Sequence, residues 1–180
     1  MSQSATAVHA MPAAIITHTV ASIRGAQEAD VAVYHARTTD VRIAMTWGGI
    51  LMTLYTAHAA QGLLEAFAAA RAKMVRVPHQ IPPRAADLNE PAARHALAID
   101  WTRRPAYAVT AQSAISRAGG NTVHWVDLYT GPITWQIRDR IGLRGALELL
   151  SRAHKTAIAV CLDGEQHSAD PTGDDYPVVA

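Results

Sequence analysis

Two stretches of the chain alternate apolar and polar residues on both sides of a turn that contains glycine. Gly48-Gly49 stands at the centre of the first stretch and Gly131-Pro132 at the centre of the second. A period of two in segments rich in β-branched and aromatic residues is typical of β-strands, and a short glycine turn between two such segments predicts a hairpin. We therefore expect strands at Val41–Trp47, Ile50–Thr56, Thr122–Thr130 and Ile133–Arg138.

A helical pattern follows each hairpin. The predicted helices span His58–Lys73 and Arg140–His154. Thr56 and Asp139 precede them, at positions where a side-chain oxygen can accept the first free N–H groups of a helix. Each helix should cover one face of the sheet that comes before it.

Further strands are predicted around these units. Two precede each hairpin and a short one follows each helix. The preceding strands are predicted at Ala14–Ile23, Val31–Arg37, Leu97–Trp101 and Ala106–Ile115. The trailing strands are predicted at Val75–Val77 and Ala157–Leu162.

The two patterns are related by an offset of 83 residues. Seven of the 35 residue pairs from 43 to 77 are identical, among them Gly48/Gly131, Gly62/Gly145 and Glu65/Glu148. An internal period of this kind indicates repeated structural units. We predict an α+β fold: a tandem duplication of an antiparallel β-meander followed by a helix, with the two repeats packed as a pseudo-twofold pair.

The rest of the chain divides around these repeats. Repeat 1 is assigned to 13–77 and repeat 2 to 95–163, with a Pro-rich linker at 78–94. Residues 1–12 and the acidic segment 164–180 are expected to be disordered. Five of the fifteen acids lie in the last eighteen residues, so residues 1–162 carry a net charge of +6. A basic body with an acidic tail is compatible with nucleic-acid contact.

Strand alternation predicts which side chains face outward from each sheet. The helix-covered side should carry Ile43, Met45, Ile50, Met52 and Leu54 in repeat 1, and Val126, Leu128, Ile133, Trp135 and Ile137 in repeat 2. The other side should carry Arg42 and Tyr55 in repeat 1, and Trp125, Tyr129 and Arg138 in repeat 2. Arginine beside aromatic rings can hold phosphates and stack bases. The same residues would also serve if these faces pack against each other or against another protein.

No other group of polar residues indicates a function as strongly as these outward-facing side chains do. Arg103 and Arg104, in a predicted turn beside Trp101, could grip a phosphate backbone. No phosphate-binding glycine loop is present, and the nine histidines lack metal-ligand spacing, although His35 and His124 could approach across the repeats. The lone Cys161 favours a small buried residue over a nucleophile. We therefore expect no catalytic residue, metal or cofactor.

The sequence leaves three functions open. In predicted topology alone, the duplicated unit resembles the single-stranded nucleic-acid-binding units of the Pur-alpha and Whirly type, although no sequence motif of either group is present. The favoured function is non-enzymatic binding of single-stranded nucleic acid through open sheet faces. The alternatives are a protein-interaction or assembly module, which would form homo-oligomers or bind a protein partner, and an enzyme with a pocket between the repeats. No apolar segment of about twenty residues or signal peptide is found, so a cytoplasmic protein without membrane contact is expected.

Overall fold

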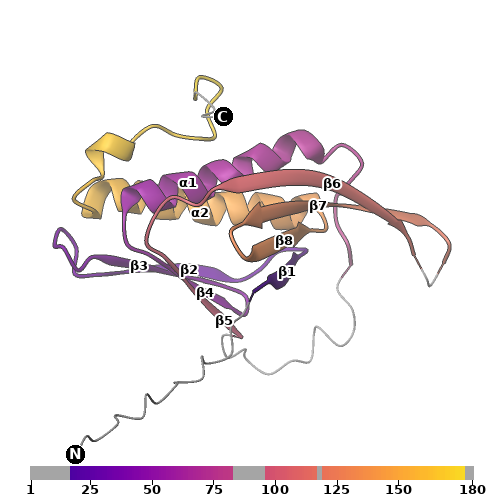
Figure 1. Cartoon of the computed structure of the whole chain (residues 1–180), viewed down its shortest axis with the longest axis horizontal. Coiled ribbons are helices and arrows are strands. Elements are labelled where there is room, and N and C mark those ends of the chain that lie inside the picture. The colour runs from indigo at the N-terminus through magenta and orange to yellow at the C-terminus, as the bar shows by residue number, and fades with distance from the viewer. Residues whose placement is uncertain (1–16, 83–95, 117–118, 177–180) are drawn as a thin grey trace, which may run out of the picture.

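The computed structural model describes residues 17–82, 96–116 and 119–176. Within these ranges four strands and a helix are followed by four strands and a second helix (Figure 1). The first set comprises β1 (Thr19–Ile23), β2 (Ala29–Tyr34), β3 (Arg42–Trp47), β4 (Ile50–Leu54), α1 (Ala57–Ala69) and the 3-10 helix η1 (Ala70–Lys73). The second comprises β5 (Leu97–Trp101), β6 (Tyr107–Ile115), β7 (Thr122–Thr130), β8 (Ile133–Ile137), α2 (Arg140–Val160) and the 3-10 helix η3 (Glu165–His167).

The strands form two four-stranded mixed sheets. Their orders are β1-β8-β7-β6 and β2-β3-β4-β5. The first strand of each set joins the sheet of the other set: β1 runs parallel to β8, and β5 runs parallel to β4. The prediction that each sheet is an antiparallel meander of consecutive strands is therefore wrong for β1 and β5. The α+β class is confirmed, while the tandem duplication stays a prediction.

Both predicted hairpins are present. Trp47 pairs with Ile50 across the β3–β4 turn, and Thr130 pairs with Ile133 across the β7–β8 turn. Gly48 and Gly131 have φ values of +53° and +60°. A residue with a Cβ atom rarely adopts this left-handed conformation, so glycine at the first turn position permits the tight connection.

The helices begin where their capping residues predict. The Thr56 hydroxyl accepts a hydrogen bond from the Ala59 N–H at 3.0 Å, and the Asp139 carboxylate accepts one from the Gly142 N–H at 2.7 Å. Asp139 is fully buried and also accepts hydrogen bonds from the N–H groups of Gly25 and Ile81. It therefore anchors two distant loops to the start of α2.

The predicted trailing strands are absent from the described structure. Residues 75–77 form a turn after η1, and α2 continues through 157–160 to its cap at Cys161. Ala153 and Ala157 are both buried on the same face of α2. The apolar stripe of the helix thus extends one turn further than the β-branched residues around Ile158 suggest.

One core is shared by both sheets and both helices. All of the residues predicted to face inward are buried except Ile50, which is half-buried. Trp47 of β3, Phe67 of α1 and Trp135 of β8 form its aromatic centre, with ring centroids 5.6–6.2 Å apart. The Trp135 indole N–H donates to the Thr130 hydroxyl at 2.8 Å, which satisfies its buried polar group.

The acidic C-terminal segment is folded rather than disordered over residues 164–176. It lies along α1: the Gln61 side chain donates to the Ala169 carbonyl, and the Tyr176 hydroxyl donates to Glu65. Gly164 lies against the backbone of Ile158, where a Cβ atom would have no room. We call residues 164–176 the C-terminal strap. The predicted disorder of 1–12 and most of the predicted linker lie outside the described residues.

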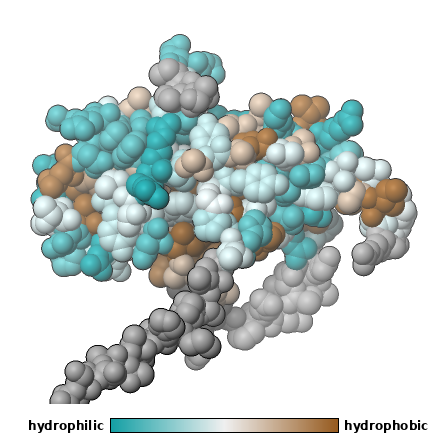
Figure 2. Space-filling view, viewed as in Figure 1, coloured by the Kyte–Doolittle hydropathy of each residue, from teal (hydrophilic) through white to brown (hydrophobic). Residues whose placement is uncertain are grey.

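The molecular surface is mostly polar in the view of Figure 2, with separate apolar patches. In the described part of the chain, neither helix combines the length and apolarity that crossing a bilayer requires.

Candidate nucleic-acid interface

The end of the β3–β4 hairpin places an arginine beside a tyrosine on the outer side of its sheet. Ile43 pairs with Leu54, so Arg42 and Tyr55 are the next residues of the two strands and lie opposite each other. The Arg42 guanidinium carbon lies 5.9 Å from the centroid of the Tyr55 ring. On its other side Arg42 pairs with Tyr34, whose side chain is 54% exposed. An exposed arginine thus stands between two tyrosines.

The same position of the other sheet carries the same kind of pair. Val126 pairs with Ile137, which places Trp125 opposite Arg138. The Arg138 guanidinium carbon lies 4.8 Å from the Trp125 ring centroid, within the range of a cation–π interaction. The Trp125 indole N–H donates to the Asp127 carboxylate at 2.9 Å, so the ring is held from its edge as well.

The two pairs occupy equivalent places in the 83-residue alignment, with their partners exchanged. Arg42 aligns with Trp125, and Tyr55 aligns with Arg138. A contact between an arginine and a ring is therefore present in both hairpins although neither residue type is kept at either position. Four of the residues predicted to form the binding site are brought together as two pairs.

Acidic side chains limit the positive charge of these outer surfaces. Asp127 is 7% exposed and lies between Trp125 and Tyr129 on the outer side of β7. Asp100 pairs with Thr53 on the outer side of the other sheet. Each outer surface therefore combines a basic side chain with an acidic one. Tyr129 is half-buried, so it offers less ring surface than an open face would.

The two arginines of the β5–β6 turn differ. Arg103 is exposed, as expected for a phosphate contact. Arg104 instead forms an ion pair with the buried carboxylate of Glu65 on α1. Its charge is already matched inside the protein, so we no longer assign it to a ligand. Sequence alone could not show this because Glu65 and Arg104 are far apart in the chain.

Glu65 is the centre of a polar cluster that sequence reasoning missed. It is 3% exposed and accepts hydrogen bonds from the Tyr107 hydroxyl at 3.0 Å and the Tyr176 hydroxyl at 2.8 Å, besides the ion pair with Arg104. Burial and the hydrogen bond to Glu65 raise the pKa of Tyr107 to about 12. The cluster joins α1, β6 and the C-terminal strap. Its satisfied partners indicate a structural role.

A second polar cluster lies at the start of α1. The Asp163 carboxylate accepts hydrogen bonds from the N–H groups of Ala57 and His58 at 2.9 and 3.0 Å. The rings of His58 and His167 stack with centroids 4.3 Å apart. Burial, followed by the nearby charge of His167, lowers the pKa of His58. This cluster fixes the strap to the helix N-terminus.

The other candidates from the sequence are not drawn together. Cys161 is buried, and burial raises the pKa of its thiol to about 11, so the thiolate is a minor form at neutral pH. His35 lies in the turn after β2 and His124 in β7, which belong to different sheets. Among the described residues, no three His, Cys, Asp or Glu side chains are grouped as metal ligands would be.

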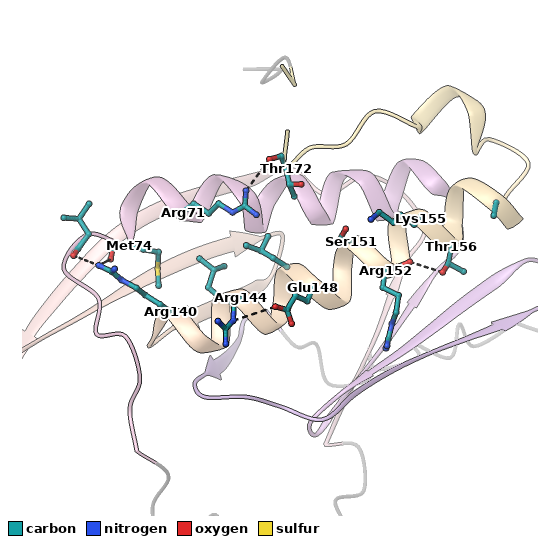
Figure 3. Close-up of a pocket in the computed structure, with 14 residues that line it drawn as sticks. Arg71, Met74, Arg140, Arg144, Glu148, Ser151, Arg152, Lys155, Thr156 and Thr172 are labelled. Carbon is teal, nitrogen blue, oxygen red and sulfur yellow. Dashed lines mark hydrogen bonds and ion pairs between the residues drawn. The ribbon is translucent and has the colours of Figure 1, made fainter. Parts of the chain in front are cut away.

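Another group of basic side chains lies elsewhere, along α2 and η1. A groove of about 1260 Å³ is lined by Arg71, Arg140, Arg144, Arg152 and Lys155, and Glu148 is the one acid among its described lining residues (Figure 3). The sequence does contain this stripe of cations, but its exposure depends on which helix the C-terminal strap covers.

The chain matches no protein-family model, no curated protein and no solved structure.

Proposed function

We propose that this protein is a non-enzymatic nucleic-acid-binding protein that prefers single strands and contacts them through the outer faces of its two sheets. The observation that supports the proposal is the pair of arginine–aromatic contacts at equivalent hairpin positions. Arg42 with Tyr55 and Arg138 with Trp125 provide, on each sheet, a planar group for stacking and a charge for a phosphate.

The two arginine–ring pairs suit an unpaired base. Each pair offers a base an aromatic ring to stack on, and the N–H groups of the arginine can reach phosphate oxygens. In a duplex the bases are paired and stacked on one another, so this surface would contact the backbone alone. Preference for single strands follows from that difference.

The acids beside these pairs limit the expected salt dependence. With Arg42 and Arg138 as the phosphate contacts, the slope of log K against log salt for a single strand should be about −1.4, from about −0.7 for each contact. A contact by Arg103 would steepen it to about −2.1. A much steeper slope would mean that other cations carry the binding.

In the test, the protein is titrated into a labelled oligothymidine of fifteen nucleotides and into a labelled duplex of equal length. Binding is followed by fluorescence anisotropy at several salt concentrations. Trp125→Ala should weaken single-strand binding by about 5- to 150-fold, because stacking contributes about 1–3 kcal/mol per base. Arg144→Gln, which removes a charge from α2, is the matched control and should leave the affinity within about twofold. Equal affinity of Trp125→Ala and wild type would contradict the proposal.

A protein-assembly role is the second candidate. It is favoured by apolar side chains exposed on edge strands, namely Val20 on β1, Val33 and Tyr34 on β2 and Ile115 on β6. An exposed strand edge with apolar side chains can pair with another chain. Sedimentation velocity over a hundredfold concentration range would detect a dimer, and Val33→Lys should abolish it.

A further inference from the structure

The groove along α2 keeps most of its positive charge. Arg71, Arg140 and Arg152 donate to backbone carbonyls, at Thr172, at Met74 and Val75, and at Ala29 respectively. A carbonyl partner leaves the charge of the guanidinium unmatched. Among the described residues, Arg144 pairs with the Glu148 carboxylate at 3.7 Å, and both side chains are largely exposed. The pKa of Asp170 in the strap is lowered by the hydrogen bond from the Thr172 N–H and also by the nearby charge of Lys155. Figure 3 shows these side chains along the length of α2 and on η1.

The corresponding face of α1 is covered by the protein itself. Gln61, Gly62 and Glu65 align with Arg144, Gly145 and Glu148 of α2. The C-terminal strap contacts Gln61 and Glu65, while Arg104 and Pro105 pack against Gly62, where an added Cβ would lie 3.2 Å from the Pro105 Cδ atom. This cover includes an acidic run, which continues from Asp163 with Glu165, Asp170, Asp174 and Asp175.

On α2 none of the described residues covers the same face in this way. The side chain of Glu148 is 72% exposed, whereas that of Glu65 is 3% exposed. A Cβ atom on Gly145 would meet nothing within 4 Å among the described residues. Glycine inside a helix costs about 1 kcal/mol relative to alanine, and at Gly62 this cost accompanies a close contact. Gly145 has the same cost without a close contact.

We propose that the groove along α2 binds an acidic segment of a partner protein. Five cations against one acid complement such a segment in charge. The described lining adds an apolar contact from Val75, which is 79% exposed and suits a peptide side chain. It contains no aromatic ring on which a base could stack. A second copy of α2 would bring a net positive stripe against its like. A peptide is therefore favoured over nucleic acid or self-association.

The experiment uses a defined acidic peptide with the sequence of residues 163–176 as the probe. It is added to the full-length, ¹⁵N-labelled protein at about 50 mM salt, near physiological pH, and amide shifts are followed. Saturable shifts confined to 140–156 of α2 are expected. The double variant Arg144→Glu/Arg152→Glu should weaken binding at least tenfold. Gly145→Gln, which places a side chain at the uncovered position, should also weaken it without lowering the melting temperature. Arg37→Glu, at an exposed position outside the groove, is the matched charge-reversal control and should bind as wild type does.

The proposal would be overturned if the peptide caused no shift in α2, or if a peptide whose acids are replaced by amides caused shifts of equal size. It would also be overturned if oligothymidine bound more tightly at the same α2 amides, or if the protein formed a dimer whose interface maps to α2. Shifts at 57–71 alone would mean exchange with the strap and would also count against it. The proposed function is tested separately, because Trp125 and Arg138 lie on a sheet and not in this groove.

Discussion

Neutralising Glu65 should weaken the fold far more than neutralising its counterpart Glu148. Glu65→Gln keeps the shape of the side chain but removes the charge that faces Arg104 and the acceptor strength that serves Tyr107 and Tyr176. Removing one member of a buried ion pair typically costs about 3–5 kcal/mol. Arg104 is 23% exposed and can regain some hydration, so the lower end, about 3 kcal/mol, is expected.

Thermal and guanidinium unfolding followed by circular dichroism measure this effect. For a chain of this length, about 3 kcal/mol corresponds to a fall in melting temperature of about 6–12 °C. Glu148→Gln, at the aligned and exposed position, should change the unfolding free energy by less than about 0.5 kcal/mol. Similar losses in the two variants would refute the argument that burial within the cluster, and not the residue type, gives Glu65 its importance.

Three further predictions concern the fold. Tyr107 has a folded-state pKa of about 12, above its ordinary value of 10. Its contribution to stability is therefore complete below about pH 10 and is lost as the pH rises toward 12. In denaturant unfolding from about pH 9 to 12, Tyr107→Phe should lose less unfolding free energy than wild type. Gly62→Ala should destabilise the fold by about 1–3 kcal/mol, because its Cβ would crowd Pro105. Gly145→Ala should stabilise it by up to about 1 kcal/mol. The opposite order of melting temperatures would contradict the contacts described for the two helices. Asp139→Ala should cost about 3 kcal/mol in denaturant unfolding, because it leaves the amides of Gly25, Ile81 and Gly142 without their acceptor, whereas Thr56→Ala should cost about 1 kcal/mol.

Local features of the fold could be predicted from the sequence. The hairpin turns at Gly48 and Gly131 and the caps at Thr56 and Asp139 depend on residues within a few positions of one another. Strand alternation likewise predicts the buried faces correctly, because a side chain and its neighbour two residues on always share a side.

Pairing between distant segments could not be predicted in this way. The alternation in Thr19–Ile23 is the same whether its neighbour is β2 or β8, so the sequence contains no local sign of the parallel pairing. The strap has the polar composition of a disordered segment, yet a few contacts such as Tyr176 with Glu65 hold it on α1. The fate of Arg104 depends on the same distant carboxylate.

For the candidate site, the residue types were informative and their surroundings were not. Alternation places Arg42, Tyr55, Trp125 and Arg138 on outer surfaces, and the hairpin registers make them pairs. The uncovered groove on α2 could not be predicted, because Glu65 and Glu148 are identical in sequence and differ only in what packs over them.

Because β1 and β5 each pair with a strand of the other set, the chain cannot complete either sheet until much of it has been synthesised. β1 leaves the ribosome before its partner β8, which follows 114 residues later. At about 5–20 residues per second, β8 is synthesised about 6–23 s after β1. During synthesis the edge of β1 is therefore free to pair with the wrong neighbour, including a nascent chain on the same message.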